Sequence, residues 1–293
     1  MIGRRPFGGW AGGEPPLKPD DYRLIRDLVR DRLGVWFGPE QRASLERRLR
    51  ERLTVRGVSS FGDYYQLLRY GTLAADEWEE ASDLLTTHET YFFREDYQLR
   101  AFSNELLPMF AERSKGKRLH VWSAGCSSGE EAYTIAMLVL ESSLFEGASD
   151  IRIYGSDLSR RCIKEARYGV YPPSSFRTTS DTAKKRWFAR EAGGFGVAPA
   201  VRTLCHFGQM NLLDGERTSL VGRCDVIFCR NVMLYFDPAA RRRVIDMFYE
   251  RLVPGGVLLL GHAESLLNVS TAFELLHLSE DLVYRKPLTA PSR

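Results

Sequence analysis

Residues 118–140, RLHVWSAGCSSGEEAYTIAMLVL, constrain the fold more than any other part of the chain. Apolar residues 119–122 predict a short strand, the small residues 123–129 a turn, and the apolar residues that recur at helical spacing after them a helix. A strand that passes through a glycine-rich turn into a helix is typical of a parallel α/β sheet that begins a nucleotide-binding half. Such a turn lets a ligand approach the backbone closely, and the helix start offers free N–H groups.

Two carboxylates, Glu130 and Glu131, lie in the first turn of this predicted helix. Carboxylates are favourable at the positive end of a helix dipole, so capping alone explains them. They would also repel a pyrophosphate, and the glycines of the turn are four residues apart, without a G-x-G-x-x-G pattern. The turn therefore indicates a ligand with a cationic or hydroxyl-bearing part, and it argues against a nicotinamide dinucleotide.

The bulk composition is that of an ordinary globular protein. The chain has 293 residues, of which 44% are hydrophobic and 27% charged, and its net charge of +3 does not call for nucleic acid or a membrane surface. This length leaves room for two domains. The five cysteines form no C-x-x-C pair, so we expect reduced thiols in the cytoplasm and no metal site. No apolar run of about 18 residues predicts a membrane span.

Three segments precede the predicted α/β domain. Residues 1–18 are rich in glycine and proline and lack the apolar region of a signal peptide, so we expect a flexible tail. Residues 19–85 carry apolar side chains at helical spacing and predict a small domain of four helices. Residues 86–117 predict a linker and a helix. A linker between domains is a common place for a ligand pocket, although Tyr91, Phe92 and Phe93 also fit a segment that simply packs.

The second predicted helix of the small domain is basic. Its arginines alternate with glutamates at helical spacing, as in Glu46 and Arg50. Such a helix is either a solvated face with internal ion pairs or a docking surface for an acidic partner.

Residues 118–287 alternate between predicted strands and helices, which indicates a Rossmann-like α/β domain with a mainly parallel sheet. Residues 172–190 look helical, and residues 193–208 predict a small β-hairpin excursion that leads into a strand at 204–208. Further strands are predicted at 151–155, 224–229, 257–260 and 282–284.

Ligands of such sheets bind outside the carboxyl ends of the strands. By this rule, the candidate ligand-binding residues are the turn 123–129, Asp157, the pair Asn211 and Leu212, and the pair Arg230 and Asn231. Asp157 can accept both hydroxyls of a ribose, or it can cap the helix that follows. The absence of a Walker A lysine argues against ATP. A sulfonium nucleoside, S-adenosylmethionine, fits the acidic turn better, with Glu131 facing its cationic end.

Several motifs resemble the CheR family of bacterial chemotaxis methyltransferases. They are T-x-x-x-Y-F-F-R-E at 87–95, V-W-S-A-G-C-S-S-G-E-E-A-Y at 121–133, G-S-D-L at 155–158, N-L-L at 211–213, F-C-R-N-V-M-L-Y-F at 228–236 and L-V-P-G-G-V-L-L-L-G-H-A-E-S at 252–265. The resemblance runs from about residue 20 to residue 285. It implies an enzyme that transfers a methyl group from S-adenosylmethionine to glutamates of chemoreceptors and releases S-adenosylhomocysteine.

The resemblance also implies roles for single residues. Arg94 would hold the methionine carboxylate near the methyl group, and Tyr235 would lie close to that group. The full set of expected cofactor contacts is His88, Thr90, Arg94, Glu131, Asp157, Asn211, Leu212, Arg230 and Asn231. The family usually has asparagine where this chain has His88, although an imidazole can still donate or accept one hydrogen bond.

The acceptor and the partner follow from the same resemblance. A glutamate is ionised at pH 7 and needs no general base, so alignment and exclusion of water would supply the catalysis. The basic helix would dock on the cytoplasmic methylation helices of chemoreceptors through Arg47, Arg48, Arg50 and Arg52. We expect a cytoplasmic monomer without a tether to a receptor's C-terminal peptide, because the excursion at 193–208 is short.

Two other functions compete with this one. A nucleic-acid methyltransferase that acts on amino groups would carry D/N/S-P-P-Y after the fourth strand, where this chain has Arg-Asn-Val-Met at 230–233. The other candidate is a signalling protein that binds S-adenosylmethionine without transferring its methyl group.

Overall fold

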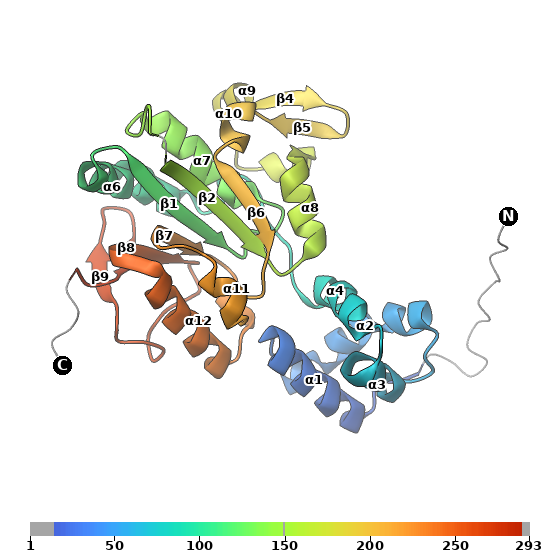
Figure 1. Cartoon of the computed structure of the whole chain (residues 1–293). Helices are drawn as coiled ribbons and strands as arrows, with labels where there is room; N and C mark the ends of the chain where they lie inside the picture. Colours follow the sequence, from blue (N-terminus) through green and yellow to red (C-terminus); the bar gives the residue numbers. More distant parts are fainter. Residues whose placement is uncertain (1–14, 149, 289–293) are drawn as a thin grey trace. The chain divides into compact units, whose positions relative to one another are not determined.

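A computed structural model describes residues 15–148 and 150–288, which belong to two compact units divided between Leu85 and Thr86 (Figure 1). Most of the predicted tail lies outside the described residues. Its last residues do not behave as a tail, because Leu17 is fully buried and its carbonyl accepts a hydrogen bond of 3.1 Å from Arg42 Nε. No helix among the described residues is both long and apolar enough to span a membrane.

The first unit contains the four predicted helices: α1 (Pro19–Leu33), α2 (Arg42–Arg56), α3 (Phe61–Tyr70) and α4 (Ala74–Leu85). A short 3₁₀ turn, Pro39–Gln41, precedes α2. Gly57 ends α2 with φ of 65°, a conformation that suits glycine, and the Ser60 side chain caps α3. Residues of one α2 face, among them Leu45 and Leu49, are completely buried, so this unit has its own core.

The second unit is built on one seven-stranded sheet with the order β6-β2-β1-β7-β8-β10-β9. The strands are β1 (Arg118–Ala124), β2 (Asp150–Asp157), β6 (Cys205–Gln209), β7 (Cys224–Cys229), β8 (Leu252–Leu260), β9 (Glu274–His277) and β10 (Leu282–Arg285). The first five strands in this order are parallel to one another, and β10 and β9 close the edge in antiparallel pairs. The chain order reverses between β1 and β7, which is where such sheets bind ligands.

Both faces of this sheet are covered. Alternate residues of β1 point to opposite faces, so Val121 belongs to one buried core and Trp122 to the other. Helices α6 (Leu107–Ser114) and α7 (Glu130–Ser142) pack on the Val121 side, while α12 (Pro238–Arg251) and the short α11 (Gly215–Ser219) flank the Trp122 side (Figure 1). Ahead of α6 the chain forms α5 (Asp96–Ala101) and a π-helical segment, Phe102–Leu106. Helix α8 (Arg160–Tyr168) follows β2.

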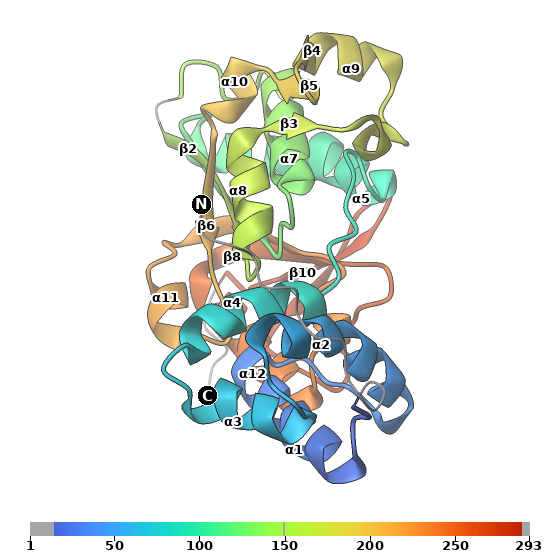
Figure 2. The ribbon, with the colours of Figure 1, turned by 90° about the vertical axis from the view of Figure 1, so that its right-hand side faces the viewer.

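A separate three-stranded antiparallel sheet, β3-β5-β4, replaces the simple hairpin predicted at 193–208. Its strands are β3 (Val170–Tyr171), β4 (Phe188–Glu191) and β5 (Gly194–Val197), and it lies with α9 (Asp181–Trp187) and α10 (Pro199–Arg202) at one end of the unit (Figure 2). The helix predicted through residue 190 ends at Trp187, because Phe188 enters β4 and packs edge-on against Phe92 and Phe176. The end of the predicted excursion, β6, belongs to the main sheet.

Candidate functional site

The turn after β1 is held close to the end of β2. The N–H groups of Gly125 and Cys126 both donate to Ser156 O, at 2.7 and 2.9 Å. Gly125 has φ of 81°, and a Cβ there would lie 2.3 Å from a methyl of Val232. Only glycine therefore suits this position on both counts. The turn leads into α7, where Glu130 and Glu131 begin the first turn as predicted.

Asp157 fixes this turn rather than capping the next helix. Its Oδ2 accepts a hydrogen bond from Ser127 N at 2.8 Å, and its Oδ1 accepts one from Ser159 N at 2.9 Å. The cap of α8 is Ser159, whose side chain accepts from Cys162 N. The carboxylate of Asp157 therefore lies at the carboxyl end of β2 with its orientation set by two backbone donors.

A buried guanidinium joins three of the predicted cofactor residues. The side chain of Arg230 is 3% exposed and donates to Arg94 O at 2.6 Å. Its Nη1 lies 3.4 Å from Glu131 Oε2, and its Nη2 lies 3.2 Å from Glu95 Oε2. Arg94 Nε also lies 3.9 Å from Glu95 Oε1, so the cluster contains two guanidiniums and two carboxylates, with Arg230 shared between Glu95 and Glu131.

Burial has the largest influence on the pKa of Glu131. Ser123 Oγ donates to Glu131 Oε1 at 2.7 Å. Burial raises the pKa of the Glu131 carboxyl above its ordinary value, and the opposing effects of Arg230 and Ser123 do not cancel it. A cationic group bound here would stabilise the ionised carboxylate.

Two buried polar atoms, Gln98 Oε1 and Arg230 Nε, have no hydrogen-bond partner within the part of the chain that the structure describes. Native proteins leave few such groups, so each calls for an explanation. A free guanidinium donor beside the carboxylates of Glu95 and Glu131 fits a ligand that carries both an anionic carboxylate and a cationic amine, as the methionine part of S-adenosylmethionine does.

The linker between residues 86 and 95 supplies the remaining predicted contacts. His88 Nε2 lies 3.1 Å from Thr86 Oγ1, and Arg94 Nη1 donates to Glu89 O at 2.8 Å. The Arg94 side chain remains 27% exposed, and Thr90 is half-buried. Phe92 anchors the linker, because it is fully buried in the aromatic cluster of the small sheet.

Backbone strain is concentrated at these loops. Phe93, Glu95, Ser127 and Asn231 all have positive φ, between 49° and 60°, although none is glycine. Left-handed conformations are uncommon for such residues and gather at functional sites. These four residues flank the predicted contacts in the linker, in the turn after β1 and in the loop after β7.

Glu264 is a functional candidate that the sequence reasoning missed. Its carboxylate accepts hydrogen bonds from Asn231 N and Gly261 N, both at 2.8 Å, and from Leu234 N at 3.2 Å. It therefore joins the loop after β8 to the loop after β7, which carries Arg230, Asn231 and the half-buried Tyr235. A carboxylate just past the end of a parallel strand was the signal that could have identified it.

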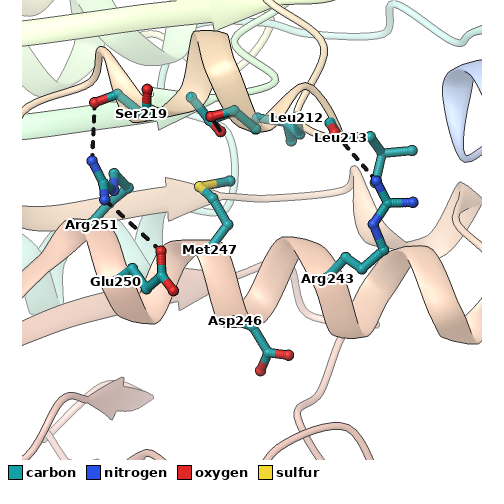
Figure 3. Close-up of a pocket in the computed structure, with 10 residues that line it drawn as sticks. Leu212, Leu213, Ser219, Arg243, Asp246, Met247, Glu250 and Arg251 are labelled. Carbon is teal, nitrogen blue, oxygen red and sulfur yellow. Dashed lines mark hydrogen bonds and ion pairs between the residues drawn. The ribbon is translucent and has the colours of Figure 1, made fainter.

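Asn211 and Leu212 follow β6, but they are not part of the Arg230 cluster. Asn211 Oδ1 accepts from Leu213 N at 3.0 Å, which shapes this loop. Leu212 lines a cavity of about 380 Å³ between α11 and α12, and Figure 3 shows Arg243, Met247 and Arg251 of α12 on its other side. No other predicted cofactor residue lines that cavity.

The predicted docking helix α2 contains arginines in different situations. Arg52 is 11% exposed and binds Glu77 through two hydrogen bonds of 2.8 and 2.6 Å. Arg48 donates to Leu84 O at 3.1 Å, and Arg50 pairs with Glu46. Arg47 is exposed. The predicted set therefore divides into Arg52, which is committed to the fold, and Arg47, which faces solvent.

Glu77 is the centre of a charge cluster within the first unit. It is 0% exposed and binds Arg52, Arg56 and the Tyr64 hydroxyl, the last at 2.6 Å. Burial tends to raise the pKa of this carboxyl, but the arginines and the tyrosine outweigh burial and lower it. Arg52 also lies 3.6 Å from the exposed carboxylate of Glu80, so this cluster contains two guanidiniums and two carboxylates.

Comparisons with known proteins agree with the motifs. A family model described as "CheR methyltransferase, SAM binding domain" matches residues 88–282, and one described as "CheR methyltransferase, all-alpha domain" matches residues 20–86. Chemotaxis protein methyltransferase 2 of Vibrio cholerae is 33% identical over 91% of this chain and 93% of its own length. The chemotaxis protein methyltransferase of Klebsiella aerogenes is 35% identical, over 89% and 88% respectively.

Solved structures with lower identity were also found. The N-methyltransferase NodS of Bradyrhizobium japonicum, in complex with S-adenosyl-L-homocysteine, is 18% identical, with a TM-score of 0.40 over 68% of this chain and 89% of that one.

Proposed function

The chain belongs to the CheR methyltransferase family, and we propose that it transfers a methyl group from S-adenosylmethionine to glutamate side chains of chemoreceptors. It is an S-adenosylmethionine-dependent methyltransferase, as its matched domain and its relatives are. The observation that best supports the proposal from geometry is the cluster of Arg230, Glu95 and Glu131, because burial raises the pKa of Glu131 and a cationic cofactor would stabilise its ionised form.

The cofactor supplies a methyl group already activated by its bond to a positively charged sulfur. In the proposal, Asp157 accepts the ribose hydroxyls, and Asn211 and Leu212 flank the adenine. Glu131 accepts the amine of the methionine part, while Arg230 and Asn231 keep that end of the pocket in place. His88 and Thr90 contribute further polar contacts from the linker. Support comes from the position of Asp157 after β2 and from the buried Arg230 Nε, which has no hydrogen-bond partner among the described residues.

The acceptor needs orientation rather than proton removal. A glutamate carboxylate is ionised at pH 7 and is itself the nucleophile. We assign Arg94 to steer this carboxylate through its exposed guanidinium, and Tyr235 to assist through its hydroxyl. Both residues are partly exposed beside segments that Glu264 and Phe92 hold in place. Alignment of donor and acceptor then lowers the barrier without a general base.

We propose that the partner is a chemoreceptor, which agrees with relatives that are named chemotaxis protein methyltransferases. We propose that its acidic methylation helices dock on α2, where Arg47 is the exposed contact and Arg48 and Arg50 assist. These helices are cytoplasmic, so the enzyme acts there. We further propose a monomer that needs no receptor tether, since only two residues join β4 to β5. The relatives do not favour the nucleic-acid or non-catalytic alternatives.

Calorimetric titration of S-adenosylmethionine into the full chain tests the cofactor site. Micromolar binding that Asp157→Ala abolishes is expected, because both ribose hydroxyls lose their acceptor. Asp150→Ala, at the opposite end of the same strand, is the matched control and retains binding. Absence of binding to the native chain would contradict the proposal.

Transfer of a radiolabelled methyl group to receptor-containing membranes tests the reaction. Glutamate methyl esters release volatile methanol in base, whereas methylated amines do not. We expect base-labile label, a rate reduced at least about 100-fold in Arg94→Ala, and a normal rate in Arg161→Ala, an exposed arginine of α8. Label that survives base, or an unchanged rate in Arg94→Ala, would rule out the assigned acceptor or the assigned residue.

A further inference from the structure

Three side chains with metal-binding atoms lie together beside the candidate cofactor site. The ligand atoms of His88, Asp157 and Cys162 are all within 4.8 Å of one another. His88 belongs to the linker, Asp157 ends β2, and Cys162 lies in the first turn of α8. His88 and Asp157 are half-buried and Cys162 is buried. The sequence analysis predicts no metal site, because the members of this group are separated by up to 74 residues and form no recognisable motif.

Ser127 and Ser159 hold this group in position. Ser127 N donates to Asp157, and Ser127 Oγ lies 3.2 Å from the His88 carbonyl and 3.8 Å from Cys162 Sγ. Ser159 N donates to Asp157, while Ser159 Oγ caps the helix turn that carries Cys162. Outer contacts of this kind orient the ligands of metal sites.

The set of donor atoms selects the metal. An imidazole nitrogen, a thiolate sulfur and a carboxylate oxygen are the ligands of Zn²⁺, whereas Ca²⁺ and Mg²⁺ take oxygen. Three protein ligands leave a fourth position open to water, as in zinc sites that exchange ligands. Ligand atoms of tetrahedral zinc lie roughly 3.5 Å apart, given bonds of about 2.0–2.3 Å, so the group must contract by about 1 Å. His88 can supply this movement, since residues 87–91 form neither helix nor strand.

We propose that His88, Asp157 and Cys162 bind one Zn²⁺ ion, and that this ion competes with S-adenosylmethionine and thereby inhibits methyl transfer. The metal site stands on its own geometry, whereas the competition rests on the proposed role of Asp157 in the cofactor site. Coordination requires the thiolate, so the Cys162 proton passes to the buffer as the zinc–sulfur bond forms. His88 provides the nitrogen that the site needs.

Titration of Co²⁺ into the full chain, first treated with a chelator, tests the site directly. Cobalt bound to a thiolate gives an intense near-ultraviolet charge-transfer band, which we expect at one equivalent. Cys162→Ser abolishes the band, and Cys205→Ser, which removes another buried thiol, retains it. His88→Asn weakens Zn²⁺ binding at least about tenfold through loss of one ligand. Absence of the band, or its persistence in Cys162→Ser, would overturn the site.

Calorimetry with S-adenosylmethionine tests the competition. We expect one equivalent of Zn²⁺ to weaken cofactor binding to the native chain at least about tenfold, and excess chelator to restore it. In Cys162→Ser, Zn²⁺ has no such effect. Unchanged cofactor affinity in the zinc-loaded chain would overturn the competition while the cobalt band stands. Failure of the metal-free chain to bind the cofactor would overturn the proposed function and the competition, but not the metal site.

Discussion

Two carboxylates, fully buried Glu77 in the helical unit and half-buried Glu131 in the α/β unit, differ in how closely guanidiniums approach them. Glu77 accepts hydrogen bonds from Arg52, Arg56 and the Tyr64 hydroxyl, and its pKa is lowered despite burial. Glu131 lies 3.4 Å from Arg230, whose guanidinium also faces Glu95, and burial raises the pKa of Glu131. The difference indicates that the first cluster serves the fold, and it supports the proposal that the second serves a cationic ligand.

Removal of Glu77 has the largest expected effect. Glu77→Ala leaves Arg52 and Arg56 without their shared acceptor, and such a loss costs about 3–5 kcal/mol of the free energy of unfolding. Urea unfolding followed by circular dichroism measures it. Glu51→Ala, which removes an exposed glutamate of α2, changes that free energy by less than about 0.5 kcal/mol. Equal stability of the two variants would show that the Glu77 cluster is not structural.

Glu264 adds a third carboxylate to the comparison of Glu77 and Glu131. Its hydrogen-bond donors are backbone N–H groups rather than arginines. Glu264→Ala leaves three backbone donors without their acceptor and lowers the free energy of unfolding by about 2–3 kcal/mol. Glu264→Gln retains one carbonyl oxygen and recovers part of the loss. We expect the alanine variant also to raise the KM for S-adenosylmethionine, since the loop with Asn231 loosens. An unchanged KM in Glu264→Ala would show that Glu264 does not contribute to cofactor binding.

Neutralising Glu131 is expected to reverse the pattern seen for Glu77. Glu131→Gln keeps the shape of the side chain but removes its charge, so the affinity for S-adenosylmethionine falls about tenfold, or ~1.4 kcal/mol. The melting temperature of the unliganded protein does not fall, because the raised pKa means that ionised Glu131 opposes folding at neutral pH. Calorimetry and thermal unfolding measure the two effects. A variant that melts much earlier would refute the assigned difference between the clusters.

The pH dependence of binding gives a smaller effect with a defined sign. A raised carboxyl pKa adds stability below the unfolded-state pKa, and this contribution is lost as pH rises through the folded-state pKa. Cofactor affinity has the opposite trend, because the amine needs the ionised carboxylate. We expect the affinity to fall several-fold as pH drops from about 7 to about 5, before ordinary glutamates protonate. Titrations in Glu131→Gln should show a flatter profile.

Charge reversal on the surface of α2 has the smallest expected effect. Arg47→Glu leaves stability unchanged and lowers kcat/KM for receptor methylation about threefold at low salt, because exposed charges contribute little. Arg69→Glu, an exposed arginine of α3, serves as the control. The effect should disappear at high salt. Equal rates for Arg47→Glu and Arg69→Glu would show that α2 is not part of the docking surface.

The sequence predicts the framework of both units well, since helices α1 to α4 and the parallel strands follow from apolar spacing. It identifies Glu131 and Asp157 because both occupy positions next to strand ends. It does not predict that Arg52 binds Glu77, because that ion pair joins residues 25 apart and resembles any other charge on a basic helix. Nor does it predict the β3-β5-β4 sheet, because β3 has two residues and Phe188 continues a helical pattern.

The helical unit, with its own leucine core and its own completed ion cluster, has a consequence for how such enzymes diversify. Substitutions on the exposed side of α2 are constrained by neither Glu77 nor the core, so they can accumulate without loss of the fold. With α2 as the proposed docking surface, receptor preference can drift faster than the chemistry, whose proposed residues all lie after Leu85. Exchanging residues 15–85 between two relatives would be a route to redirect the enzyme toward a different receptor array.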